Sequence, residues 1–252
     1  MLIYDKILLG RKNGQKQFAL LLDPDKVDMS NLPKLLDNAE QAGVDFFFVG
    51  GSLLLKDVLE QVVCFIKKYS KIPVVLFPGS IQQIEERADA LLFLSLLSGR
   101  NPDLLIGQHV KAAPILKNMD LEVMPTAYLL IDGGKSTTAS YISNTTPIPF
   151  DKPEIAACTA MAGELLGMKL IYVDTGSGAE YPVPAKTIAL LRKSVDFPII
   201  VGGGIRDAET AFITAQAGAD IVVVGTAVEK DETLLQELVA AVHNAAVQTE
   251  LK

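Results

Sequence analysis

The sequence has few of the residues that disulfides and metal sites require. Its 252 residues include two cysteines, Cys64 and Cys158, and two histidines, His109 and His243. Both cysteines fall in stretches with a helical pattern and have no metal-ligand spacing, so we interpret both as small buried apolar residues. Neither histidine has a partner at the spacing of a catalytic triad or a metal site. We therefore expect both histidines to be non-catalytic.

No stretch is long enough to cross a membrane. The longest apolar run, residues 90–97 with Ser95 inside it, is far shorter than the roughly 20 residues of a spanning helix. The chain opens without a recognisable export signal, and the two cysteines fit a reducing compartment. We therefore expect a cytoplasmic protein with no transmembrane segment.

Positive charge is also scarce. The sequence has 23 Lys and Arg against 30 Asp and Glu, a formal net charge of −7. This argues against a nucleic-acid partner, because binding to a phosphate backbone needs a basic stripe. If the ligands are anions, backbone amides or a metal ion must neutralise their charge locally.

Apolar residues, 49% of the chain, gather in eight short runs separated by longer amphipathic stretches. The runs do not alternate apolar with polar residues, which is typical of strands buried on both faces. They cover residues 18–22, 46–49, 74–77, 91–94, 123–131, 170–173, 199–201 and 221–224. Clear helical patterns between them cover residues 31–41, 57–68, 185–193 and 232–244. This alternation predicts parallel strands joined by crossover helices.

The count and length predict an α/β protein, a single (β/α)8 or TIM barrel over residues 1–252. An open, doubly wound sheet is the alternative, but no G-x-G-x-x-G motif opens a helix after the first strand. Glycine recurs where a helix ends and a strand begins, as at Gly43, Gly167 and Gly218. The long polar segment 132–153 after the fifth strand would modify the regular barrel, as a lid or as a disordered insertion.

Glycine-rich turns follow the last two predicted strands. They read Val-Gly-Gly-Gly-Ile-Arg at residues 201–206 and Val-Gly-Thr-Ala at 224–227. Glycine lets the backbone approach a ligand closely, and amides at the start of the next helix point toward an anion. Barrels commonly bind phosphate after strands 7 and 8, so we predict a phosphate site here. Two tight turns without a ligand are the alternative.

Carboxylates follow the sixth and first strands. In Tyr-Val-Asp-Thr-Gly-Ser-Gly-Ala at 172–179, Asp174 could bind a hydroxyl or act as a base, unless it or Ser177 caps the next helix. Leu-Asp-Pro-Asp-Lys at 22–26 presents two carboxylates that suit Mg²⁺, although an ordinary turn explains it equally well. Gly-Gly-Ser at 50–52 is a weaker signal.

Six strand-end sequences together resemble those of the geranylgeranylglyceryl phosphate synthase family. They are Leu-Asp-Pro-Asp-Lys, Val-Gly-Gly-Ser, Leu-Phe-Pro-Gly-Ser, Tyr-x-Asp-x-Gly-Ser-Gly-Ala, Val-Gly-Gly-Gly-Ile-Arg and Val-Gly-Thr, in that order over essentially the whole chain. The chain is most similar to the second of the family's two groups. The resemblance implies a Mg²⁺-dependent prenyltransferase that joins geranylgeranyl diphosphate to the C3 hydroxyl of sn-glycerol 1-phosphate. Diphosphate is released, and the product is an ether-lipid precursor.

The resemblance also implies roles for the matching residues. Asp174 would be catalytic, Asp23 and Ser52 would lie on the metal side, and apolar residues near strands 3 to 5 would line a groove for the prenyl chain. The sn-glycerol 1-phosphate site would comprise Tyr172, Val173, Asp174, Thr175, Gly176, Ser177, Gly178, Gly203, Gly204, Gly225 and Thr226. Because the family forms dimers or hexamers, we expect a homo-oligomer.

Two positions depart from the family pattern, and two other functions compete with this one. Asp174 is often Glu in relatives, and Leu21 is Lys in some. The absence of this Lys makes diphosphate neutralisation here more dependent on the metal.

One alternative function is that of another phosphate-binding barrel enzyme, of the indole-glycerol-phosphate synthase or thiazole synthase type. The predicted strands contain no lysine before their C-terminal ends, which argues against Schiff-base chemistry. A non-catalytic sensor of a phosphate ligand is the second alternative, and Asp23, Ser52 and Asp174 argue against it.

Overall fold

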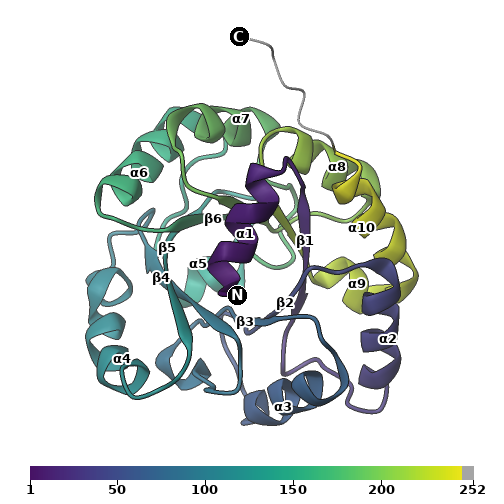
Figure 1. The fold of residues 1–252 in the computed structure, drawn as a ribbon. Coiled ribbons are helices and arrows are strands. Elements are labelled where there is room, and N and C mark those ends of the chain that lie inside the picture. The colour runs from purple at the N-terminus through teal and green to yellow at the C-terminus, as the bar shows by residue number, and fades with distance from the viewer. Residues whose placement is uncertain (246–252) are drawn as a thin grey trace.

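The chain folds into a closed barrel of parallel strands surrounded by helices (Figure 1). The computed structural model describes residues 1–245. Its eight strands pair in chain order, and the last pairs with the first. The predicted barrel is therefore confirmed and the open sheet is excluded. Residues 246–252, the end of the predicted domain 1–252, lie outside the described residues.

The eight apolar runs of the sequence form the eight strands, with bounds that shift by at most two residues. Each run is buried on both faces, by the barrel interior inside and by helices outside. The strands are β1 (Gln17–Leu22), β2 (Phe46–Val49), β3 (Val74–Leu76), β4 (Ala90–Leu96), β5 (Glu122–Leu130), β6 (Leu170–Asp174), β7 (Ile199–Gly202) and β8 (Ile221–Val224).

Most of the helices cover the outside of the barrel, and α1 (Ile3–Lys12) lies across one end of it (Figure 1). The others are α2 (Leu32–Ala42), α3 (Leu59–Tyr69), α4 (Gln108–Leu116), α5 (Thr138–Ile142), α6 (Pro153–Leu165), α7 (Ala185–Ser194), α8 (Ala208–Gln216), α9 (Thr226–Lys230) and α10 (Leu235–His243). Short turns of other helix types are η1 (Ile81–Gln83), η2 (Asp103–Gly107) and η3 (Glu232–Leu234). Within residues 1–245, none of these helices could span a bilayer.

The connection between β3 and β4 departs from the regular pattern. It contains η1 and no crossover α-helix, so the expectation of eight amphipathic helical stretches is wrong at this point. Pro78 and Gly79, which interrupt helices, directly follow Phe77 at the start of the segment 77–89. The barrel is thus modified next to β4, the strand whose residues line an apolar cavity.

The long segment after β5 is ordered. It forms α5, whose N-cap residue Thr137 makes a capping box with Ser140. A parallel bridge joins Ile131 to Ile148, and the carbonyl of Gly133 accepts hydrogen bonds from the next loop. The segment is therefore not a disordered insertion, and the lid stays a prediction.

The burial predicted for the cysteines is wrong for Cys158 and only partly right for Cys64. Cys158 is exposed on α6, whereas Cys64 on α3 has intermediate burial. The inner face of α6 is formed by small residues such as Ala156 and Ala160. Cys158 lies on the opposite, outer side of that helix, so its apolar character does not bury it.

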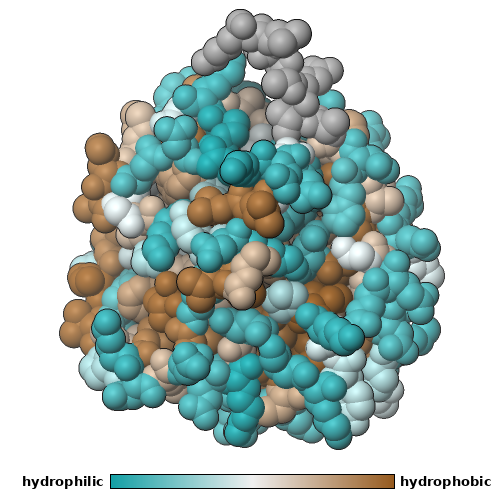
Figure 2. Space-filling view, in the orientation of Figure 1, coloured by the Kyte–Doolittle hydropathy of each residue, from teal (hydrophilic) through white to brown (hydrophobic). Residues whose placement is uncertain are grey.

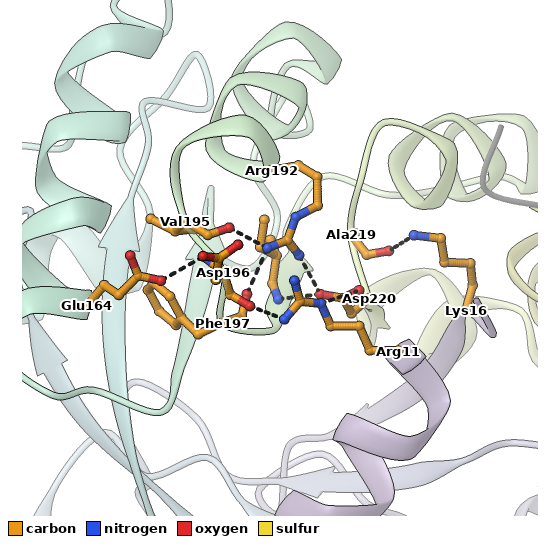
Figure 3. A network of polar contacts seen from close by, with 10 residues as sticks. Arg11, Lys16, Glu164, Arg192, Val195, Asp196, Phe197, Ala219 and Asp220 are labelled. Atoms are coloured by element: carbon orange, nitrogen blue, oxygen red, sulfur yellow. Dashed lines mark hydrogen bonds and ion pairs between the residues drawn. The ribbon is translucent and has the colours of Figure 1, made fainter. Parts of the chain in front are cut away.

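A network of polar contacts ties α1 to the strands at one end of the barrel (Figure 3). Asp220 is 5% exposed and accepts hydrogen bonds from the Arg192 guanidinium, at 3.0 Å, and from the Ile199 amide, at 2.8 Å. Lys16 donates to the Ala219 carbonyl at 2.7 Å, and Arg11 donates to the Asp196 carbonyl. The buried Asp220 carboxylate thus pairs with two cations, Arg192 at 3.0 Å and Arg11 at 3.9 Å.

Replacement of Asp220 should destabilise the barrel strongly. Asp220→Ala leaves Nη1 of Arg192 and the Ile199 amide without their acceptor and removes the buried charge that pairs with Arg192, which should lower the free energy of unfolding by about 3–5 kcal/mol. Urea denaturation measures the change. Asp196→Ala is the matched control, because that exposed residue enters the network only through its backbone carbonyl and amide. Equal stabilities of the two variants would contradict this role of Asp220.

Candidate active site

Asp174 is a buried carboxylate at the end of β6. Its Oδ2 accepts a hydrogen bond from the Tyr128 hydroxyl at 2.7 Å, and its Oδ1 accepts one from the Gly176 amide at 2.7 Å. Burial raises the pKa of Asp174, while these hydrogen bonds oppose the rise. The next helix, α7, begins eleven positions later at Ala185, so the alternative in which Asp174 or Ser177 caps that helix is wrong.

An aromatic cluster inside the barrel lies next to Asp174. The rings of Phe77 and Tyr172 stack with centroids 4.6 Å apart, and Tyr128 meets both of them edge-on. Tyr172 is 1% exposed. The cluster removes water from the neighbourhood of the carboxylate, and this explains why burial dominates its pKa.

The glycine turns after β6 and β7 pack tightly against each other. Gly203 has φ +83°, and a Cβ placed on it would lie 2.5 Å from the Asp174 Oδ1 and 2.5 Å from the Thr175 Oγ1. Any side chain at this position would therefore strain the backbone and close the space beside Asp174. Among the described residues, the buried Thr175 hydroxyl has no hydrogen-bond partner, so it is available to a ligand that enters this space.

The predicted phosphate residues converge from the three loops after β6, β7 and β8. The hydroxyls of Ser177 and Thr226 lie 3.0 Å apart, which joins the turns after β6 and β8. The amides that open α9 have no side-chain cap, but those that open α8 are already capped by Asp207. Asp207 occupies only the Thr210 amide, so the use of the other α8 amides by a phosphate stays a prediction. The side chain of Val173 lies on the other face of β6, so only its backbone borders the site.

Of the predicted metal residues, Asp23 directly follows β1, and Ser52 follows Gly51 in the turn after β2. A Cβ placed on Gly51 would lie 3.7 Å from the Asp23 carboxylate. Lys26 forms an ion pair with Asp23 at 2.9 Å and with Glu229 at 3.4 Å. Within residues 1–245, no three His, Cys, Asp or Glu side chains are placed to share a metal ion. One carboxylate and one hydroxyl still fit Mg²⁺, because protein-bound Mg²⁺ takes most of its other ligands from water and substrate phosphates.

A mostly apolar cavity extends from this mouth between β4 and α4. Its polar end contains Ser52 and Ser80, and Tyr128 borders it as well. Leu91, Phe93, Leu104, Ala112, Leu116 and Ile142 are among the apolar residues that line the rest. The groove predicted near strands 3 to 5 therefore exists, and the missing crossover helix after β3 leaves room for it.

His109 lies in the wall of this cavity. Its Nε2 is 3.1 Å from the Ser95 hydroxyl, and its ring packs edge-on against Phe93. Burial lowers its pKa, which keeps the imidazole neutral in an apolar surrounding. His243, by contrast, pairs with Asp45 at 2.9 Å near the C-terminal end of α10. Neither histidine contacts Asp174, as expected for non-catalytic residues.

Sequence reasoning missed Tyr128, which touches both Asp174 and the cavity. It lies in the middle of an apolar run that predicts only a strand. The alternation along β5 indicates that Thr126, Tyr128 and Leu130 share one face, but only barrel closure shows that this face meets β6. A tyrosine among inward-facing residues was the one available signal.

Comparison with known proteins identifies the relatives of this chain. Residues 12–244 match the PcrB family. The chain belongs to the PcrB family. It is 54% identical to the geranylgeranylglyceryl phosphate synthase of Chitinophaga pinensis over 244 residues, which is 97% of each chain. It is 48% identical to the synthase of Thermococcus gammatolerans over 217 residues, 86% of this chain and 85% of that one.

A solved structure of the same type superposes on the whole barrel. The (S)-3-O-geranylgeranylglyceryl phosphate synthase from Thermoplasma acidophilum, in complex with its substrate sn-glycerol-1-phosphate, has a TM-score of 0.90 at 34% identity. The match covers 96% of this chain and 99% of that one. The resemblance carried by the six motifs is thus confirmed. This PcrB family member is a prenyltransferase, and the alternative of a non-catalytic sensor is excluded.

Removal of the Tyr128 hydroxyl should shift the pH dependence of this prenyltransferase. The hydroxyl stabilises the ionised form of Asp174, so Tyr128→Phe should raise the pKa of that carboxyl further. If activity requires the ionised carboxylate, the acidic limb of kcat/KM should move to higher pH by about one unit, the effect of a hydrogen bond to a charged group. Tyr141→Phe is the control, since Tyr141 is 80% exposed on α5. An unchanged acidic limb in Tyr128→Phe would refute the coupling.

Proposed function

We propose that this enzyme joins geranylgeranyl diphosphate to the C3 hydroxyl of sn-glycerol 1-phosphate in a Mg²⁺-dependent reaction. The observation that carries the proposal is the position of Tyr128. Its hydroxyl binds Asp174, beside the glycine turns after β6 and β7, and its ring borders the apolar cavity beside β4. A polar half suited to glycerol phosphate and an apolar half suited to a prenyl chain therefore meet at one carboxylate.

The glycerol phosphate would bind to the turns after β6, β7 and β8. Backbone amides there, with the Ser177 and Thr226 hydroxyls, supply donors to phosphate without a basic side chain. This suits a chain with a net charge of −7. The relative from Thermoplasma acidophilum, which superposes over the whole barrel, was solved with sn-glycerol-1-phosphate and supports the same ligand here.

Asp174 would accept the proton of the glycerol hydroxyl. The hydroxyl oxygen forms a bond to C1 of the prenyl chain, the bond from C1 to the diphosphate oxygen breaks, and the proton passes to the carboxylate. A raised pKa makes Asp174 a stronger base, while the hydrogen bonds from Tyr128 and Gly176 keep it ionised. The same carboxylate could orient the glycerol by accepting its hydrogen bonds, which contributes through positioning.

Asp23 and Ser52 would hold Mg²⁺ together with the diphosphate. A bound Mg²⁺ ion would neutralise the negative charge that develops on the leaving group. Leu21, which is Lys in some relatives, supplies no charge, so Lys26 is the nearest cation to Asp23 in the described contacts. Removal of Mg²⁺ by a chelator should therefore abolish product formation.

Another phosphate-binding barrel chemistry is the weaker candidate. The eight strands contain no lysine, so no amine stands inside the barrel for a Schiff base. The buried Lys16 precedes β1 and donates to Ala219 in the polar network around Asp220. The two exposed or partly exposed cysteines carry no disulfide, which supports a reducing, cytoplasmic setting for the proposed reaction.

We also propose a homo-oligomer. Apolar side chains gather along the edge of the molecule formed by α6 (Figure 2). Ile155, Met161, Leu165 and Leu166 on this helix and its end are 38% to 90% exposed, and such contiguous exposure is typical of an interface.

Light scattering tests the assembly. At micromolar concentration the mass should be at least twice the 27.1 kDa of one chain. Leu165→Glu together with Met161→Glu should reduce it, because two charges would have to lose water in the interface. A monomeric mass for the unaltered chain would contradict the proposal.

Substitution of Asp174 tests the proposed chemistry. Asp174→Asn keeps the size and removes the base, so turnover should fall by about a hundredfold or more. Asp174→Glu should retain much more activity, since relatives use Glu at this position. The measurement is release of diphosphate from geranylgeranyl diphosphate and sn-glycerol 1-phosphate. Equal rates for Asn and unaltered enzyme at saturating substrates would exclude both the base and the orienting role.

A further inference from the structure

Gln83 is a buried polar residue that lies behind the cavity mouth. It ends η1 in the connection between β3 and β4 and is 2% exposed. Its side chain does not line the cavity, although Ile81 and Ile84 beside it do. A buried amide is costly unless both of its ends are hydrogen-bonded, so the partners of Gln83 indicate what it does.

Both ends of the Gln83 amide bind one residue, Gly51. The Gly51 amide donates to Oε1 at 3.1 Å, and Nε2 donates to the Gly51 carbonyl at 2.8 Å. β2 ends at Val49, whose carbonyl accepts the last strand contact from the Phe77 amide at 2.9 Å. The side chain of Gln83 thus replaces β3 as the pairing partner of the chain beyond the end of β2.

The backbone around Gly51 is packed too closely to move freely. A Cβ on Gly50, which has φ +147°, would lie 2.2 Å from the Phe77 carbonyl oxygen. A Cβ on Gly79 would lie 2.4 Å from the Gly51 carbonyl oxygen and 2.9 Å from the Ser52 Cα. On its other side, Gly51 faces Asp23. A Cβ placed on Gly51 would lie 3.7 Å from the Asp23 carboxylate. Gln83 therefore fixes the segment that carries Ser52 opposite Asp23.

We propose that Gln83 is a positioning residue for the metal and diphosphate end of the site. It holds Gly51 beside Asp23, and so fixes the turn that carries Ser52, the second residue proposed to hold Mg²⁺ with the diphosphate. The inference rests on the proposed function, because that function puts diphosphate at this end. Gln83 does not touch the turns after β6, β7 and β8, so it should leave the glycerol phosphate side unaffected.

Two variants test the proposal by calorimetry with inorganic diphosphate plus Mg²⁺ as one probe and sn-glycerol 1-phosphate as the other. Gln83→Met keeps the volume and loses both hydrogen bonds, and Gln83→Asn is too short to make both. In each, the affinity for Mg²⁺ and diphosphate should fall by about tenfold or more, the usual loss when an outer partner of a metal site is removed. The affinity for sn-glycerol 1-phosphate should stay within about twofold of the unaltered value, within the scatter expected for distant sites.

Gln82→Met is the matched control, because Gln82 is exposed on the same turn, and it should leave both affinities unchanged. Asp23→Asn is the reference variant, because it removes the carboxylate that is proposed to hold Mg²⁺ with the diphosphate. Unchanged diphosphate affinity in a folded Gln83→Asn or Gln83→Met protein would overturn the proposal, as would an equal loss of both ligands. Product formation by the unaltered enzyme tests the proposed function separately. If product forms while the Gln83 variants bind diphosphate normally, only the positioning role fails.

Discussion

The hydrogen bond between Tyr128 and Asp174 is the contact on which the arrangement of the site depends. It joins the neighbouring strands β5 and β6 on the inner side of the barrel, at 2.7 Å, where the carboxylate is almost fully buried. An ionised carboxylate without partners would be expensive in this place. The phenol and the Gly176 amide supply partners, and the aromatic cluster beneath them excludes water. The result is a carboxylate with a raised pKa at the border between a polar turn and an apolar cavity.

An acidic chain that acts on anionic substrates has to create positive potential locally. In the proposed function the turns after β6, β7 and β8 would do so with backbone amides and hydroxyls, and they can pack closely because Gly203 tolerates φ +83°. At the ends of β1 and β2 the positive potential would come from a cation, which Asp23 and Ser52 are suited to share with the substrate. The two proposed sites lie on adjacent sectors of the same barrel mouth, because β8 pairs with β1.

Much of this could be predicted from the sequence, because strands buried on both faces leave continuous apolar runs and their ends carry short glycine-rich motifs. The bounds of β2 and β8 agree with those runs to the residue. Contacts between distant residues could not be predicted in this way. Gln83 and Gly51 are 32 positions apart, and Tyr128 and Asp174 are 46 apart. The absent helix after β3 and the exposure of Cys158 likewise depend on how neighbouring elements pack, which periodicity alone does not contain.

The central claim is that the two halves of the mouth bind two different substrates that meet at Asp174. A crystal structure of the enzyme with sn-glycerol 1-phosphate, Mg²⁺ and a non-hydrolysable prenyl diphosphate analogue tests it most directly. The account predicts phosphate density between Gly203 and Thr226, a glycerol hydroxyl within hydrogen-bond distance of Asp174, and the prenyl chain between β4 and α4. Density for the prenyl chain outside this cavity, or for the glycerol away from Asp174, would contradict it.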